Sequence, residues 1–296
     1  MFRLLTLLST LVVSTLGLYY APGLKVRFDF ACVGIGTKAF IELPQNTTVA
    51  AASGWVQKTR PDSPVGFETL ELWCPSTDYT VCLLFDDTGY VAGMQIAFDE
   101  ELVSNAEYDW TVQGYTNWTT TMNDTTENYF TVQQYYVSKE TLAKAATCKA
   151  ARDSSLLLQE DSLWVSGING ELFEISTKAS DITGGNSLFT KQQCIPRMGY
   201  HYYYNMTTSS ECIDKLMFPW FPLIDHDQLI GIGFNLFGQY TPNTGSTNWF
   251  EYSGETAVRY TIPNGPDCLY EIAGRVGQVT MHTYFIESPY NVVCMA

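Results

Sequence analysis

Basic side chains are scarce in this chain, and so is charge of either sign. The 296 residues include 16 Lys and Arg against 31 Asp and Glu, and charged residues make up 16% of the total, below the roughly 25% usual for soluble domains. Because the net charge of −15 repels phosphate backbones, we expect no binding to nucleic acid. A hydrophobic content of 46% with 14% aromatic residues is also too apolar for an intrinsically disordered chain.

Motifs of the common catalytic classes are missing as well. The sequence has no HExxH, no G-x-S-x-G elbow, no P-loop, no EF-hand spacing and no CxxC pair, which argues against these metal, hydrolase, nucleotide and thiol sites. The stretch from Gly34 to Ala39 fits G-x-G-x-x-A, but a strand-like FIEL follows it, so no nucleotide cofactor is expected. A triad assembled from distant residues stays open, because such sites are recognised by geometry.

The chain begins like an exported protein. Arg3 precedes an apolar run from Leu4 to Val13, and small residues follow up to Gly17, which predicts a signal peptide over residues 1–17. The run is shorter than the roughly 20 residues that a membrane span needs, and neither a later span nor a lipid-anchor tail is evident. We therefore expect a secreted, extracellular product without a membrane anchor.

Cysteines and sequons agree with export. Eight cysteines after the leader predict four disulfides in an oxidising compartment: Cys32, Cys74, Cys82, Cys148, Cys194, Cys212, Cys268 and Cys294. If the two halves of the chain are related, as the repeated segments described below indicate, equivalent cysteines would pair. This favours Cys74–Cys148 and Cys212–Cys294, although Cys74–Cys82 stays open. Four N-x-S/T sequons predict glycosylation, at Asn46, Asn117, Asn123 and Asn205.

The predicted fold is mainly β. A Ser-capped run of strong helix formers predicts one short helix near residues 139–150, and Asn169-Gly170 predicts a hairpin turn. Runs of β-branched and aromatic residues predict strands at 25–30, 39–43, 80–85, 90–98, 129–137, 229–237, 257–262 and 278–286.

Similar segments recur in the two halves. The run from Cys32 resembles the run from Val165 at an offset of 133, and the segment ending at Phe98 resembles that ending at Phe237 at an offset of 139. Three weaker matches lie in the same order, which indicates an internal duplication. We expect two tandem β-rich repeats, residues 18–157 and 158–296, that form a barrel or sandwich-like body with pseudo-twofold symmetry, either as two lobes or as one interlocked domain.

All three histidines, His201, His226 and His282, fall in the second repeat. On the offsets above, His201 faces Glu68 and His226 faces Asp87, so imidazoles replace carboxylates. Imidazole is a general acid, base or metal ligand, which makes the three histidines candidate catalytic residues. Ordinary packing is the competing interpretation, and the sequence leaves any metal unknown.

A tyrosine-rich tract suggests a ligand site. Strand alternation would place Tyr200, Tyr202 and Tyr204 on one face, with His201 and Tyr203 on the other. If that first face lines a cavity, its rings suit a small aromatic or amphipathic molecule, although core packing is an alternative. Trp220 lies in FPWFPLI, whose prolines favour an edge strand or a loop over a pocket, and completes the candidate ligand-binding set.

Three functions fit these features. The first is a secreted, disulfide-bonded glycoprotein that binds a small ligand in a Tyr/Phe/Trp-lined cavity. The second is a secreted oxidoreductase, a cofactor-independent or metal-assisted oxygenase of the luciferase kind, in which His201 with His226 or His282 supplies the base. The third is an extracellular matrix or structural protein. The oligomeric state is not predicted.

Overall fold

The computed structural model describes residues 20–27, 39–122, 124–147, 153, 155–159, 162–243 and 246–294. The predicted leader, the glycine motif up to Lys38, Cys32, Cys148 and the sequon residue Asn123 lie outside these ranges. In chain order the elements are β1 (Pro22–Arg27), β2 (Phe40–Glu42), α1 (Thr47–Ala52), β3 (Trp55–Lys58), β4 (Glu71–Pro75), β5 (Val81–Phe85), β6 (Val91–Asp99), β7 (Val103–Ser104), β8 (Thr116–Met122), β9 (Thr125–Tyr135), α2 (Lys139–Thr147), β10 (Leu163–Ser166), β11 (Leu172–Ile175), α3 (Ala179–Thr183), β12 (Phe189–Ile195), β13 (Gly199–Tyr204), β14 (Trp220–Asp225), β15 (Gln228–Phe237), β16 (Gln239–Tyr240), β17 (Glu251–Ser253), α4 (Glu255–Thr261), α5 (Asp267–Val276) and β18 (Gln278–Ile286), with single 3-10 turns at Glu100–Leu102, Ile168–Gly170 and Pro289–Asn291.

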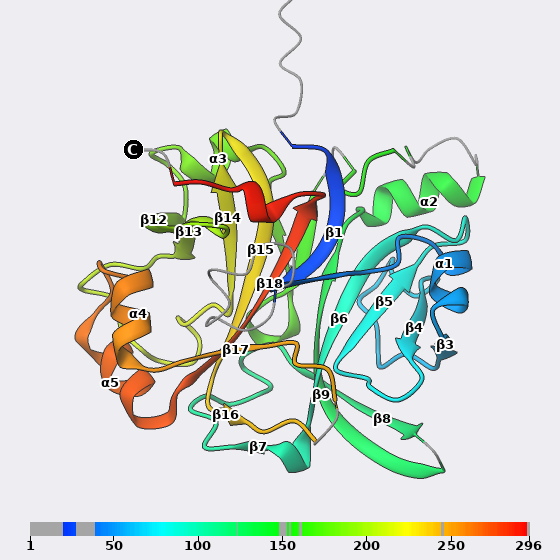
Figure 1. The fold of residues 1–296 in the computed structure, drawn as a ribbon, viewed down its shortest axis with the longest axis horizontal. Helices are drawn as coiled ribbons and strands as arrows, with labels where there is room; N and C mark the ends of the chain where they lie inside the picture. The colour runs from blue at the N-terminus through cyan, green and yellow to red at the C-terminus, as the bar shows by residue number, and fades with distance from the viewer. Residues whose placement is uncertain are drawn as a thin grey trace, which may run out of the picture.

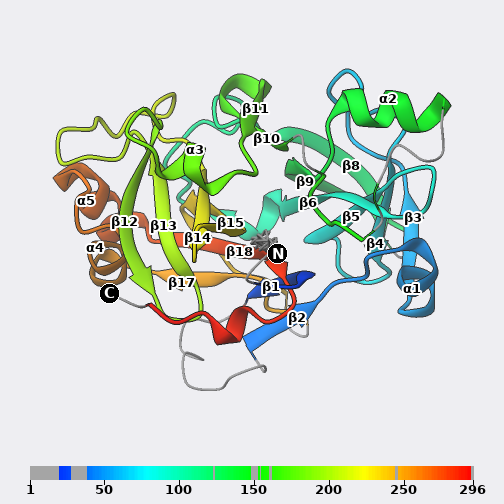
Figure 2. The ribbon, with the colours of Figure 1, turned by 90° about the horizontal axis from the view of Figure 1, so that it is seen from above.

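Two large antiparallel sheets form the molecule, as Figures 1 and 2 show. Sheet 1 has the order β11-β10-β9-β6-β5-β4-β3, with β8 also paired to β9. Sheet 2 has the order β12-β13-β14-β15-β18-β1-β2, with β17 also paired to β18, and β7 pairs with β16 in a small third sheet. The N-terminal strands β1 and β2 therefore complete a sheet whose other strands all follow residue 188. The mainly β, sandwich-like fold class is confirmed.

Apolar side chains gather in three cores, because each sheet buries residues on both faces. The inter-sheet core joins Phe98 of sheet 1 to Trp220 and Phe234 of sheet 2. The outer face of sheet 1 packs around Tyr135, and the outer face of sheet 2 packs around Tyr284 against α4 and α5. In Figure 1 these two helices lie beside the sheet that contains β12 to β15.

Most predicted elements are present. The strand over 278–286 matches β18, and α2 begins after Ser138, whose hydroxyl accepts the Thr141 backbone N–H (3.1 Å) as a helix cap does. β10 and β11 pair as the predicted hairpin, with positive φ at Asn169 (57°) and Gly170 (75°). The loop is longer than two residues, since the last pair is Ser166 with Leu172.

The strand predicted over 257–262 is wrong, because this segment belongs to helix α4. Its β-branched residues suggested a strand, but Val258 and Ile262 are both buried four residues apart, which is the period of a helix face. An ion pair between Arg259 and Glu255 (2.8 Å) adds a helical i,i+4 contact. α1, α3 and α5 were also not predicted, so the expectation of a single helix is wrong.

The edge strand or loop predicted from the prolines of FPWFPLI is also wrong. β14 is an interior strand between β13 and β15, not an edge strand or a covering loop. The pairing of β13 with β14 is limited to Leu223 and Ile224. Pro222 lies outside that pairing, which lets an interior strand accept a residue without an N–H.

Three disulfides join the described cysteines: Cys74–Cys82, Cys194–Cys294 and Cys212–Cys268. The favoured pairs Cys74–Cys148 and Cys212–Cys294 are wrong, and the alternative Cys74–Cys82 is correct. Equivalent pairing fails because β4 and β5 are hydrogen-bonded neighbours, which places Cys74 beside Cys82 within one sheet. Three bridges indicate an oxidising compartment. Across the described ranges, no helix has the length and apolar character of a membrane span.

Candidate functional site

A charged cluster of four side chains is buried in sheet 2, and its members are Arg27, Glu251, His201 and His282. They meet because β1 and β17 both pair with β18, where Arg27 lies opposite His282 and Glu251 lies opposite Thr280. Residues directly opposite in antiparallel strands point to the same face, so Arg27 and His282 share the outer face of sheet 2 with Tyr284.

Short contacts connect the cluster in a chain. Arg27 Nε donates to Glu251 Oε1 (3.1 Å), and His282 Nδ1 lies 3.2 Å from the same oxygen without the alignment of a hydrogen bond. His282 Nε2 lies 3.3 Å from His201 Nε2. The side chains of Arg27 and Glu251 are 0% and 1% exposed, so this is an ion pair removed from water, which is costly to desolvate.

His201 stays neutral in this environment. Its Nδ1 lies 3.2 Å from the carbonyl oxygens of both Gln193 and Gly199, which assigns the proton to Nδ1 and leaves Nε2 to accept from His282. Burial, followed by the neighbouring His282, lowers the pKa of His201 to about 3. His201 is therefore an unprotonated base whose free nitrogen is occupied by His282.

Arg27 has donors that the cluster does not use. Its Nη1 and Nη2 atoms are buried and have no hydrogen-bond partner among the described residues. Buried polar atoms are nearly always paired, and a guanidinium is the side chain least able to lose its charge. The guanidinium carbon also lies 5.6 Å from the centre of the Phe40 ring. The buried and unpaired Nη1 and Nη2 atoms make this end of Arg27 the most unusual polar group of the site.

Aromatic rings surround the charged cluster. Phe221 lies 5.5 Å from the rings of both His201 and His282, and Tyr203 stacks on Phe221 at 4.5 Å. A Cβ on Gly233 would lie 1.9 Å from the Phe221 ring, so this glycine makes the room that Phe221 occupies. Burial raises the pKa of Tyr203, which keeps its hydroxyl protonated. The site combines apolar ring surface with one buried cation.

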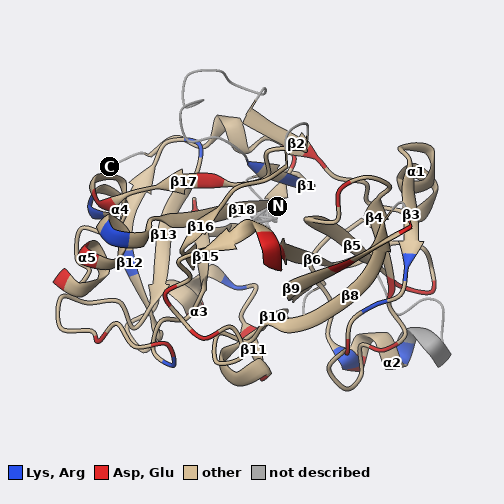
Figure 3. Cartoon of the chain, turned by 90° about the horizontal axis from the view of Figure 1, so that it is seen from below, with Lys and Arg blue, Asp and Glu red and all other residues tan. Residues whose placement is uncertain are grey.

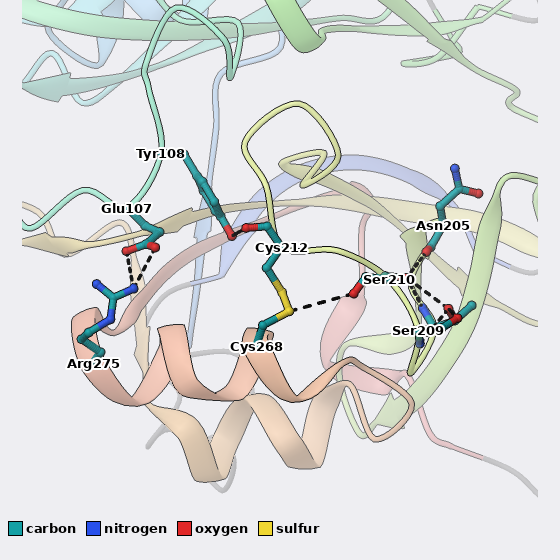
Figure 4. Close-up of a disulfide and its surroundings, with 9 residues drawn as sticks. Glu107, Tyr108, Asn205, Ser209, Ser210, Cys212, Cys268 and Arg275 are labelled. Atoms are coloured by element: carbon teal, nitrogen blue, oxygen red, sulfur yellow. Dashed lines mark hydrogen bonds and ion pairs between the residues drawn. A yellow bond between two sulfur atoms is a disulfide. The ribbon is translucent and has the colours of Figure 1, made fainter.

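A cross-linked layer covers this face of sheet 2. Figure 4 shows the Cys212–Cys268 disulfide, which ties the loop after β13 to helix α5. Near it Tyr108 donates to the carbonyl oxygen of Cys212 (3.3 Å), and Arg275 forms an ion pair with Glu107 (2.7 Å). These contacts hold α5 against the outer core of sheet 2.

Sheet 1 carries a neutral cluster at the corresponding place. Gln133 of β9 donates to Gln95 of β6 (3.2 Å) and to Thr131 (3.1 Å), and it accepts from Ser166 of β10 (3.0 Å). By strand order and register, Gln133 and Ser166 occupy the places that His282 and Arg27 occupy in sheet 2. This polar cluster of sheet 1 therefore contains no charged group, whereas the cluster of sheet 2 has four titratable groups.

The structure brings together two of the three histidines. His226 lies in the β14–β15 turn at φ 47°, with its Nδ1 2.7 Å from Asp225 Oδ2. Tyr20 donates to the same carboxylate oxygen (2.6 Å). His226 is therefore part of a surface turn that anchors the N-terminal segment, and the charged cluster does not include it.

The tyrosine tract alternates as predicted. Tyr200, Tyr202 and Tyr204 face the inter-sheet core, whereas His201 and Tyr203 face the outer core of sheet 2. Trp220 is also in the inter-sheet core, where its Nε1 donates to the carbonyl oxygen of Ser166 (2.8 Å). These four predicted ligand contacts pack the interior, so the aromatic surface near the charged cluster comes from other residues. Ligand binding by Tyr200, Tyr202, Tyr204 and Trp220 stays a prediction.

The remaining candidate features lie outside the charged cluster. Asn117 and Asn205 are exposed and Asn46 is half-buried, which is compatible with glycans at these three sequons. In Figure 3 the positions of Asp and Glu are spread along strands and loops of both sheets. Among the described residues, no group of three or more His, Cys, Asp or Glu is placed to hold a metal ion. A hollow of about 730 Å³ between α4 and α5 is lined by Tyr260, Ala273 and neighbouring residues.

Sequence reasoning missed Arg27 and Glu251. Arg27 ends the strand PGLKVR, two residues after Lys25, so its charge did not mark it as a buried residue. Glu251 gave no signal, because it lies 224 residues from its partner.

Comparisons with known proteins found no match. No protein-family model matches the chain, no curated protein matches it, and no solved structure matches its fold.

Proposed function

We propose that the protein is a secreted glycoprotein that binds a small amphipathic ligand at the charged cluster of sheet 2. The observation that carries the proposal is the buried Arg27 end, whose Nη1 and Nη2 atoms lack partners within the described chain. Phe40 lies beside this end of Arg27, and Phe221 with Tyr203 lies beside the two histidines of the cluster. Small-ligand sites characteristically combine apolar walls with a few oriented polar groups.

The neutral cluster of sheet 1 supports a functional role for the charges. Burying an ion pair seldom adds stability compared with neutral or apolar side chains. At the register positions of His282 and Arg27, sheet 1 has Gln133 and Ser166, which are uncharged and hydrogen-bond to each other. The charged residues of sheet 2 are therefore best explained by recognition.

The comparison of the two clusters rests on an internal duplication, which we include in the proposal. Residues 18–157 contain β1 to β9 and residues 158–296 contain β10 to β18. The first strand of each half pairs with the last strand of the other half: β10 with β9, and β1 with β18. The two repeats would then exchange their first two strands and form one interlocked body.

Contacts between equivalent residues support the twofold relation. A Cβ on Gly93 would lie 2.5 Å from the carbonyl oxygen of Gln134, and one on Gly231 would lie 2.4 Å from that of Thr283. Gln134 in turn donates to Thr283 (3.1 Å), as residues beside a twofold axis do. Tyr136 and Phe285, each two residues further along, pack edge to face at 5.5 Å.

Ligand binding is tested on the secreted, glycosylated protein. Native mass spectrometry before and after gentle denaturation should release a co-purifying small molecule, and an environment-sensitive dye should bind and be displaced by it. Phe221→Ala should weaken dye binding at least tenfold, whereas Tyr260→Ala at the exposed surface of α4 should not change it. Absence of both a co-purified molecule and dye binding would refute the proposal.

A second candidate, a luciferase-like oxygenase, rests on the contact between His201 and His282. On this proposal the substrate would displace His282 from His201 Nε2 and use that nitrogen as the proton acceptor. Oxygen consumption or light emission that is lost in His201→Ala and kept in His226→Ala would support it. Full activity of His201→Ala would exclude His201 as the base.

A further inference from the structure

We propose that the N-linked glycan of Asn46 is part of the fold: its first sugar residues pack into a hollow of the protein surface and stabilise the chain. This inference rests on the glycoprotein part of the proposed function and gives one sequon a structural role. Asn46 lies between β2 and α1. It lines a hollow of about 540 Å³ to which β2, the end strand of sheet 2, and β3, the end strand of sheet 1, both contribute residues.

The Asn46 side chain is held in place with its nitrogen available. Its Oδ1 atom accepts the Val49 backbone N–H (2.9 Å) and so caps α1. Its Nδ2 atom has no hydrogen-bond partner among the described residues and is not enclosed by the protein. The neighbouring backbone is fixed as well, because the Thr47 N–H donates to the Gly89 carbonyl oxygen (2.9 Å). A glycan on Nδ2 would therefore start from a defined position at the hollow.

Glycan attachment leaves the helix cap intact. The oligosaccharide is transferred to Asn46 from a polyprenyl pyrophosphate donor. A bond forms from Nδ2 to C1 of N-acetylglucosamine, the bond from C1 to the pyrophosphate oxygen breaks, and a proton and the lipid pyrophosphate leave. Because Nδ2 keeps one hydrogen and Oδ1 stays an acceptor, α1 remains capped after the modification.

Two tryptophans give the hollow the aromatic surface that a sugar ring contacts. Trp249 is held by a hydrogen bond from its Nε1 to Asp78 Oδ2 (2.8 Å). The Nε1 atom of Trp55 has no acceptor among the described residues and is not enclosed by the protein. A pyranose has an apolar face of C–H groups that packs on such rings, and its acetamido oxygen can accept from an indole N–H.

The remaining walls match a sugar in the same way. Gln45, Ser53 and Thr247 line the hollow with amide and hydroxyl groups, which can pair with sugar hydroxyls. Val49 also lines it and is 47% exposed, so a sugar residue placed there would remove apolar surface from water. The volume is that of a small-ligand site, about 300–1,000 Å³, so the first one or two sugar residues fit and the rest of the glycan extends into solvent.

The other described sequons provide the internal comparison. Asn117 and Asn205 are exposed, and they line neither this hollow nor the one between α4 and α5. Their glycans would therefore project into solvent, and only the glycan of Asn46 would pack on the protein.

Enzymatic deglycosylation tests the packing without any variant. The secreted protein from a eukaryotic host is treated with peptide-N-glycosidase under native conditions in heavy-oxygen water, and mass spectrometry of peptides follows each site. Cleavage at Asn46 should be at least tenfold slower than at Asn117 and Asn205. After denaturation the three sites should be cleaved at equal rates.

Thermal unfolding tests the stabilisation. Thr48→Ala removes the sequon of Asn46 but keeps the asparagine cap, and Thr119→Ala removes the sequon of Asn117; both threonines are exposed. In glycosylated protein Thr48→Ala should lower Tm by about 3 °C and Thr119→Ala by less than about 1 °C. Subtracting the shifts measured in unglycosylated protein removes the effect of the side-chain changes themselves.

The outcomes separate this inference from the proposed function. Native cleavage at Asn46 as fast as at Asn117, or no loss of Tm on removal of the Asn46 glycan, would overturn the inference and leave the glycoprotein standing. An unmodified Asn46 beside a glycosylated Asn117 or Asn205 would do the same. Absence of glycan from every sequon would refute both the inference and the glycoprotein part of the proposed function.

Discussion

Glu251 faces two nitrogen groups at once, the Arg27 guanidinium and the His282 ring, and all three are almost completely buried. At the scale of single residues this makes the cluster depend on one carboxylate. The same arrangement explains why single residues, taken one at a time in the sequence, did not reveal it.

Glu251→Gln should destabilise the protein by about 4 kcal/mol, because it leaves Arg27 buried without a counter-charge. Glu255→Gln is the matched control, since its ion pair with Arg259 is half exposed and contributes less than about 1 kcal/mol. Urea unfolding of both variants measures the difference. Equal losses in the two would show that Glu251 does not hold a buried charge.

His201 should make the protein sensitive to acid. Its pKa is about 3 in the folded chain and about 6.5 in the unfolded chain. Between these values the unfolded chain binds a proton that the folded chain does not, so stability falls as the pH is lowered. The loss approaches about 1.4 kcal/mol per pH unit for this one group.

The measurement is the unfolding free energy from pH 6.5 to 4.5 for wild type and His201→Gln. The wild type should lose about 2 kcal/mol more than the variant over this range. His226→Gln, in the surface turn, is the control and should follow the wild type. Parallel curves for wild type and His201→Gln would contradict the buried neutral imidazole.

At the scale of elements, two glycines let neighbouring strands approach closely. Gly93→Ala and Gly231→Ala should each cost about 1–3 kcal/mol, because the new Cβ would meet a carbonyl oxygen at 2.5 and 2.4 Å. Gly185→Ala should be nearly neutral, since nothing lies within 4 Å of its Cβ. Similar losses at the first two sites support equivalent repeats, and a large loss at only one would count against them.

The disulfides should differ in their contribution to the free energy of unfolding according to the length of the loop that each one closes. The chain-entropy model predicts about 4 kcal/mol for Cys212–Cys268 and about 2.5 kcal/mol for Cys74–Cys82, whose residues are separated by 56 and 8 positions. Paired Cys→Ser variants, compared by denaturant unfolding, check this order. The reverse order would show that strain or packing outweighs loop closure.

At the scale of the whole molecule, the chain closes on itself through β1 and β2. The Glu287 backbone N–H donates to the Ala21 carbonyl oxygen (2.8 Å), so the start of β1 and the end of β18 are neighbours.

A circular permutant should therefore fold. It would begin at Pro44 and continue through Cys294 and a flexible linker to Tyr20, so that β1 and β2 follow β18 along the chain. We expect its Tm to lie within a few degrees of the wild type. Deletion of residues 20–43 should abolish cooperative unfolding, because it removes two strands and the Arg27 partner of Glu251. A folded deletion variant would contradict this role of the N-terminal strands.

Features that depend on neighbouring residues could be predicted from the sequence. β18, the Ser138 cap and the alternation of Tyr200 to Tyr204 depend on neighbouring residues, as does the positive φ of Asn169. Each is encoded by propensity or periodicity within one element. The failure at α4 shows the limit, since a run of six residues with three β-branched side chains fits a strand until the burial of Val258 and Ile262 reveals a helical face.

By itself the amino-acid sequence determined the β-rich class, the disulfide-forming character and the unequal distribution of histidine between the halves. Only the tertiary structure decided that β1 completes sheet 2, that Cys74 pairs with Cys82, and that Arg27 meets Glu251 across 224 residues. The physical reason is range: local preferences act over a few residues, whereas long-range pairings depend on which complete arrangement buries the most apolar surface while satisfying its polar groups.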